Sequence, residues 1–212
     1  MQRRYSLSDH LIGHADNMLR TLFAPPSAAR PSPATDVENQ GLETWEQDEA
    51  RRLMRVNHTG EVCAQALYQG QSLTARNPAL RETFRKAAEE ENDHLAWCED
   101  RIRSLDGRTS RLNPLFYVGS YAIGAMAGVL GDRASAAFLA ETEYQVADHL
   151  NRHLQKLPAA DRKSHSVIRQ MTEDELEHAK TAEQVGDLQL SEPAKGMMRL
   201  MSRVMTGTSY LV

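Results

Sequence analysis

The sequence has few cysteines, few aromatic residues and no surplus of positive charge. Only two cysteines, Cys63 and Cys98, occur in 212 residues, and they form no CxxC pair, so neither a disulfide framework nor a thiolate metal site is expected. The 25 basic and 29 acidic residues are well mixed and give a net charge of −4, which disfavours nucleic acid as a partner. This cysteine usage fits a reducing compartment such as the cytoplasm.

An export signal is also absent from the sequence pattern. The chain begins MQRRYS, but acidic residues and histidines interrupt the next ten positions, so this stretch lacks the apolar segment of a secretory signal. Residues 6–23 instead repeat apolar side chains at intervals of three and four, which predicts a short amphipathic helix. Residues 24–36 contain four prolines among small residues and have the composition of a linker. We therefore expect an N-terminal segment, 1–40, followed by one main domain, 41–212.

The main domain is rich in helix-forming residues and poor in strand-forming ones, which predicts an all-α fold. Breaks at "RNPAL" (76–80), "DGRTSRLNP" (106–114) and "LPAAD" (157–161) divide it into helices. The expected helices are 42–75, 78–105, 132–156, 159–186 and a short amphipathic one at 194–205. The first four form two antiparallel hairpins, and two hairpins packed together make a four-helix bundle.

Residues 112–131 contain no charged side chain. Three interpretations fit: a buried crossover helix with one side facing a membrane, a fully buried crossover, or a transmembrane span. Length does not decide, because a helix of that length reaches about 30 Å, which suits a bundle or a bilayer. We favour the first interpretation, since the segment is apolar on all sides and its glycines are spaced for close packing: Gly119, Gly124, Gly128 and Gly131.

Two Glu-x-x-His pairs are the main candidates for functional residues in the sequence. In "EEENDHLAWCED" (89–100), Glu91 and His94 lie on the apolar stripe of the helix, whereas Glu90 faces polar neighbours. Considered alone, such a pair is more often a structural salt bridge. "TEDELEHAK" (172–180) repeats the spacing with Glu175 and His178, again on an apolar stripe. A buried carboxylate must be paired, protonated or bound to metal, so the repeat favours a shared site.

Each Glu-x-x-His helix has a hairpin partner that carries one inward carboxylate. Glu143 lies on an apolar stripe and is preferred over Glu141, and Glu61 follows the small Gly60. At about 1.5 Å of rise per residue, each lies level with the pair on the other arm of its hairpin. The site then has four carboxylates and two imidazoles: Glu61, Glu91, His94, Glu143, Glu175 and His178.

This ligand set is typical of the di-iron carboxylate site of ferritin-like bundles. Four carboxylates in one core repel one another unless cations neutralise them, and mixed oxygen and nitrogen ligands suit iron or manganese. We expect two iron ions, with Glu91 and Glu175 bridging them. Terminal ligands are Glu61 and His94 on one ion and Glu143 and His178 on the other. The second nitrogen of each imidazole should donate a hydrogen bond to a group outside the ligand set, which fixes the tautomer of the ring. The alternative is a purely structural salt-bridge network.

Other residues of these types receive ordinary interpretations. His149 lies one and a half turns beyond Glu143 and is a weak candidate for polar work near the site, but we favour an ordinary, partly exposed histidine. His58 and His153 receive the same ordinary interpretation. Cys98 lies on the apolar stripe and is expected to be a buried core residue.

Four segments of the sequence resemble the demethoxyubiquinone hydroxylases, ferritin-like enzymes of ubiquinone biosynthesis: "RVNHTGEVCAQALYQGQ", "EEENDHLAWC", "ETEYQVADHL" and "DELEHAKTA". The resemblance covers roughly residues 45–212 and all six ligand positions. It implies a monooxygenase that uses O₂ to hydroxylate the ring of a 2-polyprenyl-3-methyl-6-methoxy-1,4-benzoquinol. It also implies an electron donor that the sequence does not identify, peripheral attachment to the cytoplasmic side of the cell membrane, and other proteins of ubiquinone biosynthesis as partners.

Three other functions remain compatible with the same ligands. The first is iron storage or peroxide removal, which has no need of a long apolar crossover. The second is a di-iron hydroxylase acting on another substrate, such as an acyl chain or tRNA, although the charge balance disfavours tRNA. The third is a quinone-binding or scaffold protein without catalysis, which the complete ligand set disfavours.

Overall fold

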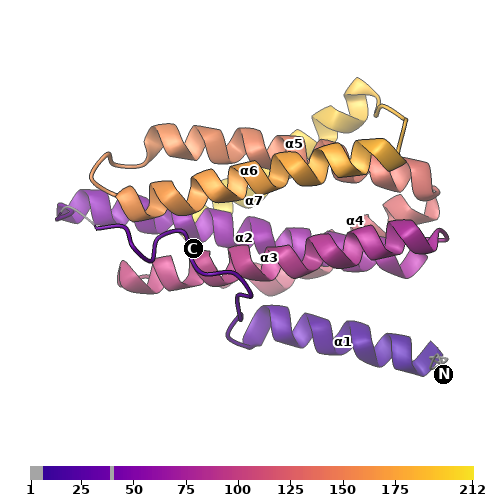
Figure 1. Ribbon diagram of the computed structural model, residues 1–212, viewed down its shortest axis with the longest axis horizontal. Coiled ribbons are helices and arrows are strands. Elements are labelled where there is room, and N and C mark those ends of the chain that lie inside the picture. The colour runs from indigo at the N-terminus through magenta and orange to yellow at the C-terminus, as the bar shows by residue number, and fades with distance from the viewer. Residues whose placement is uncertain (1–6, 39–40) are drawn as a thin grey trace.

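The structure is a computed structural model that describes residues 7–38 and 41–212, and these residues form seven α-helices and no strand (Figure 1). The start of the first predicted helix at residue 6 and the predicted boundary at residue 40 lie outside the described residues. The all-α prediction is confirmed. The helices are α1 (Leu7–Phe23), α2 (Thr44–Thr74), α3 (Pro78–Ser104), α4 (Asn113–Val129), α5 (Asp132–Lys156), α6 (Arg162–Val185) and α7 (Glu192–Leu211).

Local sequence signals explain where the bundle helices begin. The side chain of Asn77 accepts a hydrogen bond from the backbone of Ala79, and Pro78 occupies the first turn of α3. Asp161 caps α6 in the same way, by accepting from the backbone of Ser164. Such caps satisfy backbone N–H groups that have no partner within the helix. The predicted bundle helices therefore agree with the observed ones to within three residues at each end.

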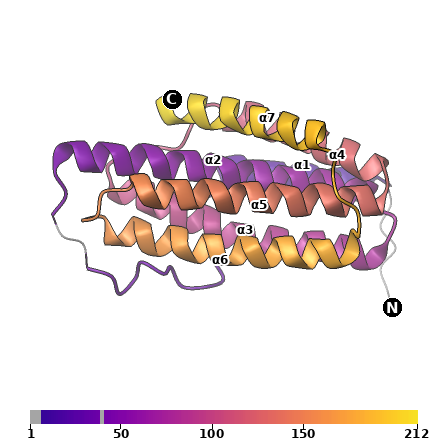
Figure 2. The ribbon, with the colours of Figure 1, turned by 90° about the horizontal axis from the view of Figure 1, so that it is seen from above.

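Helices α2 and α3 form one hairpin and α5 and α6 the other, and the four lie side by side in both views (Figures 1 and 2). Their core has two apolar clusters. One includes Leu53, Trp97, Ile102, Leu150 and Met171, and the other includes Tyr68, Leu80, Phe84, Leu139 and Ala182. On each of the four helices, the predicted ligands fall between the residues of these two clusters. Burial of each large apolar side chain contributes about 1.5–3 kcal/mol, which offsets the cost of holding polar groups between them.

Helix α4 packs along α2 through glycines. A Cβ on Gly124 would lie 2.2 Å from the backbone oxygen of Leu67, and one on Gly70 would lie 2.2 Å from that of Tyr121. A Cβ on Gly128 would lie closer still to the hydroxyl of Thr74 on α2. The prediction of close packing is wrong for Gly119 and Gly131, because among residues 7–38 and 41–212 no atom of another element lies within 4 Å of a Cβ position on either glycine. Gly131 instead adopts a φ of 109° at the start of α5, which favours glycine.

The outer surfaces of α4 and α7 expose large apolar side chains. Leu115 is 68% exposed, and Val118, Met126 and Val129 on the same helix are similarly open. Helix α7 packs on α2 and α5 and is longer than the predicted segment 194–205. Among the described residues, no helix combines the length and the apolarity that crossing a membrane requires.

The proline-rich segment 24–38 is not helical, yet it is fastened to the bundle. It follows the α3–α6 face, whereas α7 lies on the opposite side (Figure 2). The hydroxyl of Ser166 on α6 donates a hydrogen bond of 2.8 Å to the carbonyl of Pro33, and Ala34 packs against the core. The composition typical of a linker therefore gave no sign that this segment is held in place.

Candidate metal centre

Four helices bring the six predicted ligands together inside the bundle. Glu61 comes from α2, Glu143 from α5, one Glu-x-x-His pair from α3 and the other from α6. Glu91 and His94 are fully buried, and Glu61, Glu143 and Glu175 are at most 2% exposed. The apolar stripes explain this placement, because a helix that turns its stripe into the core carries every residue on that stripe with it.

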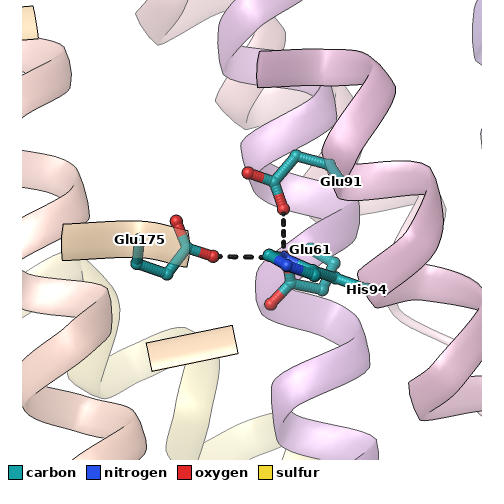
Figure 3. A group of neighbouring side chains, drawn as sticks. All are labelled: Glu61, Glu91, His94 and Glu175. Carbon is teal, nitrogen blue, oxygen red and sulfur yellow. Dashed lines mark hydrogen bonds and ion pairs between the residues drawn. The ribbon is translucent and has the colours of Figure 1, made fainter. Parts of the chain in front are cut away.

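The first group of ligand atoms surrounds His94 (Figure 3). One atom each from Glu61, Glu91, His94 and Glu175 lies within 4.8 Å of all the others. Nδ1 of His94 is 3.0 Å from Oε2 of Glu91, 3.3 Å from Oε1 of Glu175 and 3.5 Å from Oε2 of Glu61. A cluster of this size and burial can hold one metal ion.

The second group consists of Glu143, Glu175 and His178, whose ligand atoms also lie within 4.8 Å of one another. Glu175 therefore belongs to both groups. Glu91 also faces both, because its Oε1 is 3.6 Å from Nδ1 of His178 while its Oε2 contacts His94. Glu91 and Glu175 thus each lie between the two groups of ligand atoms, which is where a carboxylate that bridges two metal ions would have to lie.

The carboxylates and imidazoles of the centre shift one another's pKa values. Burial and the neighbouring charge of Glu91 raise the pKa of Glu61 well above its usual value, and burial together with Glu175 does the same to Glu143. Burial acts to lower the pKa of both imidazoles, but the carboxylates around them outweigh it. The pKa of His94 is therefore raised, and that of His178 rises to about 9.

The pKa of Glu175 moves in the opposite direction to those of Glu61 and Glu143. Burial acts to raise it, but the imidazoles of His178 and His94, 3.5 Å and 3.3 Å from its oxygens, lower it below the usual range. The charge of this shared carboxylate is thus held by two imidazoles that a metal ion would replace as partners.

Unsatisfied atoms test whether these residues fit a metal pair. Buried side-chain atoms without a hydrogen-bond partner include Oε2 of Glu61, Glu143 and Glu175, and Nδ1 of His178. Leaving a buried polar atom unpaired costs about 1–3 kcal/mol, so four on one set of residues indicate a missing partner. Carboxylate oxygens and imidazole nitrogens are the ligands that iron and manganese accept. The residues therefore fit two such ions.

Each imidazole has an outer partner on the opposite hairpin. Nε2 of His94 lies 2.9 Å from Oδ2 of Asp174, and Nε2 of His178 lies 2.9 Å from Oε2 of Glu90. The sequence predicts such partners without identifying them, and it indicates only that Glu90 faces polar neighbours. A signal was present, because each partner directly precedes a Glu that belongs to a Glu-x-x-His pair.

Tyr68 is a further residue that the sequence pattern did not single out for function. Its phenol donates a hydrogen bond to Oε1 of Glu143 and is 3.3 Å from Oε1 of Glu91. Burial and the charge of Glu143 raise its pKa well above 10, so it remains a donor. Its position seven residues after Glu61, on the same helix face, was the available signal.

Two of the ordinary interpretations are wrong. His58 and His153 are 5% and 4% exposed, not partly exposed, because residues of other helices lie against them, Asn113 of α4 against His58 and Asn57 of α2 against His153. The ring of His153 forms a 2.7 Å hydrogen bond with the Asn57 amide oxygen. His149 is half-buried, as expected. Cys98 is fully buried against Met171, which confirms it as a core residue.

Comparison with known proteins adds independent evidence. Residues 48–209 match the family described as ubiquinone biosynthesis protein COQ7. A protein of Laribacter hongkongensis named 3-demethoxyubiquinol 3-hydroxylase is 56% identical over 202 residues, which is 95% of this chain and 98% of that protein. Proteins with the same name from Chromobacterium violaceum and Stutzerimonas stutzeri are 53% and 51% identical, and cover 96% and 100% of this chain and 99% of their own lengths. The similarity therefore extends further toward the N-terminus than the resemblance to residues 45–212.

Proposed function

The chain belongs to the COQ7 family of ubiquinone biosynthesis proteins, and we infer that it is a 3-demethoxyubiquinol 3-hydroxylase that uses a di-iron centre. The observation that carries the inference is the buried set of four carboxylates and two imidazoles beside an apolar cavity. A pair of iron ions held there would supply the activation of O₂ for ring hydroxylation. We propose Glu91 and Glu175 as the bridging ligands and Glu61, His94, Glu143 and His178 as the terminal ones.

The cavity is suited to a benzoquinol with an apolar tail. It has a volume of about 470 Å³ and lies among α2, α4, α5 and α7. Its lining is mostly apolar, with Leu67, Ile123 and Met201 among the contributors, and it includes the ligand Glu61. A ring that entered from this side would reach the Glu61 end of the centre, while the apolar walls exclude water from the reacting carbon.

The protein's own residues would perform the positioning. Tyr68 holds Glu143 and contacts Glu91, and the two outer carboxylates orient the imidazoles. Because each of these groups is held by a neighbour on another helix, the bundle itself preorganises the centre.

We further propose that the α4 and α7 surface contacts the membrane from the cytoplasmic side, as a peripheral attachment. Exposed apolar residues on these two helices support this proposal. They line the cavity or lie next to it: Leu115, Val118, Leu200, Met201 and Val204. A polyprenyl tail resides in the bilayer, so a cavity that opens between these helices would receive its substrate from there. Both cysteines are free thiols, which suits a reducing compartment.

Quinone analysis of a deletion strain tests the function. The strain should accumulate demethoxyubiquinone, and the wild-type gene should restore ubiquinone, whereas Glu143→Ala should not. Unchanged quinones in the deletion strain would refute the assignment. The iron-storage alternative predicts that quinones remain normal and that iron handling changes, so the same strain separates the two functions.

A further inference from the structure

Arg30, in the proline-rich segment, joins two helices of different hairpins. Its Nε lies 2.6 Å from Oδ2 of Asp93 on α3, and its Nη2 lies 2.8 Å from Oδ2 of Asp174 on α6. The side chains of Asp93 and Asp174 are only 3% and 10% exposed, whereas that of Arg30 is 38% exposed. A guanidinium presents several donors in a fixed fork and can bind two carboxylates at once, so Arg30 neutralises both.

Further contacts hold Arg30 in this position. The backbone N–H of Ala29 donates a 2.6 Å hydrogen bond to Oδ1 of Asp93. The guanidinium carbon lies 4.9 Å from the centre of the Trp97 ring, and the indole N–H of Trp97 points to the carbonyl of Arg30. The anchor between Ser166 and Pro33 holds the segment three residues further along. These contacts indicate a docked segment with a defined register.

Asp174 connects Arg30 to the metal centre. Its Oδ2 accepts hydrogen bonds from both Nη2 of Arg30 and Nε2 of His94, and its Oδ1 accepts from Gln170. Because both carboxylate oxygens have partners, the side chain has one preferred orientation. The ring of His94, which faces Glu91 with its other nitrogen, is oriented by the same contacts.

The other half of the centre lacks this support. Glu90 is the equivalent partner of His178, but its side chain is 48% exposed. In the part of the chain that the structure describes, His178 is the only ion-pair partner found for Glu90. The six ligands thus have approximate twofold symmetry, but the outer carboxylates that contact the two imidazoles do not. Asp174 is buried and paired with Arg30, whereas Glu90 is exposed.

We propose that Arg30 is a positioning residue of the metal centre, which acts through Asp174 and His94 and strengthens metal binding at the position of Glu61 and His94. The position of Glu143 and His178 does not depend on it. Loss of an outer partner of a ligand typically lowers metal affinity by about 10- to 100-fold. The inference rests on the metal centre of the proposed function but not on the substrate.

Titration of the metal-free protein with Co²⁺ tests the proposal. The wild type should bind two ions in two steps that absorbance and calorimetry both detect. Arg30→Gln should weaken one step by about 10-fold and leave the other within about twofold, while Arg30→Lys, which keeps the charge but not the fork, should be intermediate. In an Asp174→Asn background, Arg30→Gln should add no further loss, because its effect passes through Asp174.

Arg85→Gln is the matched control. Arg85 lies on α3 and also pairs with two carboxylates, Glu82 and Glu89, but on the exposed surface. The Arg85→Gln variant should bind both Co²⁺ ions with the affinities of the wild type. Unfolding of the metal-free variants, followed by circular dichroism, checks that they fold; if Arg30→Gln does not, Arg30→Lys decides.

Three results would overturn the proposal: unchanged affinity in Arg30→Gln, equal weakening of both steps, or tighter binding. Uptake of fewer than two ions by the wild type would instead count against the proposed metal centre, so the two failures are distinguishable.

Discussion

The phenol of Tyr68 on α2 donates a hydrogen bond to the carboxylate of Glu143 on α5, in a part of the core where each residue is 1% exposed. The contact crosses from one hairpin to the other. It therefore connects the packing of the two hairpins to the geometry of the proposed metal pair.

Replacing Tyr68 with Phe should loosen Glu143 and weaken the centre. The change removes one donor from a buried carboxylate, which costs about 1–3 kcal/mol, and iron affinity should fall by about 10-fold or more. Iron content after dialysis and thermal unfolding of the loaded protein measure both effects. Tyr117→Phe is the control, because Tyr117 is also buried and donates to Gln69 on α2. It should lose stability while keeping two irons, and equal iron loss in both variants would contradict the prediction.

Metal binding should release protons. The pKa of His178 is about 9, that of His94 is raised, and the pKa values of Glu61 and Glu143 lie well above their usual range because both are buried beside other carboxylates. These groups bind metal in their deprotonated forms, so affinity should rise with pH up to the His178 pKa of about 9, and metal binding at pH 7 should release protons. Calorimetry in two buffers of different ionisation enthalpy gives the number. Identical apparent enthalpies in the two buffers would count against proton release.

The contact between α2 and α4 should tolerate no side chain at Gly124. A Cβ there would lie 2.2 Å from the backbone oxygen of Leu67, and backbone cannot move aside as a flexible side chain does, so Gly124→Ala should destabilise by about 1–3 kcal/mol. Gly119→Ala on the same helix has open space and should be neutral or stabilising by up to about 1 kcal/mol. Urea unfolding measures both. Equal effects would show that the close approach does not decide stability.

Filling the cavity should impair substrate binding without disturbing the metal centre. Gly119 lines the cavity, and no packed neighbour in the described part of the chain lies within 4 Å of its Cβ position, so Gly119→Trp can place an indole there. The KM for a prenylated demethoxyubiquinol should rise by about 10-fold or more, on the order of the 1.4 kcal/mol that a tenfold change represents. Iron content should remain two per chain, and Gly119→Ala should behave as the wild type. An unchanged KM in Gly119→Trp would argue against this entry route.

Helical periodicity was sufficient to predict the bundle and to select the six residues that meet in its core. Glu91 was separable from Glu90, and Glu143 from Glu141, because the members of each pair lie on different faces of one helix. Similar distances from the hairpin turns then predicted that carboxylates on different helices would meet, since the rise per residue is constant along a helix.

The same reasoning failed for residues whose surroundings come from another element. His58 and His153 are buried by side chains that periodicity of their own helices does not describe. Gly119 and Gly124 belong to the same series of glycines along α4, yet of these two only Gly124 packs closely against α2. In these cases the neighbour, not the local pattern, decides the environment.

By itself, the sequence determined the helices, the inward faces of those helices and the level at which the carboxylates and imidazoles meet, because these follow from the regular geometry of a helix. The groups that hydrogen-bond to the ligands from outside the centre were set by the packing of the helices and of segment 24–38. Arg30 reaches Asp174 across 144 positions of sequence, and His94 reaches the same carboxylate across 80. Contacts over such separations depend on how the hairpins and the docked segment pack together, and no local spacing records that packing.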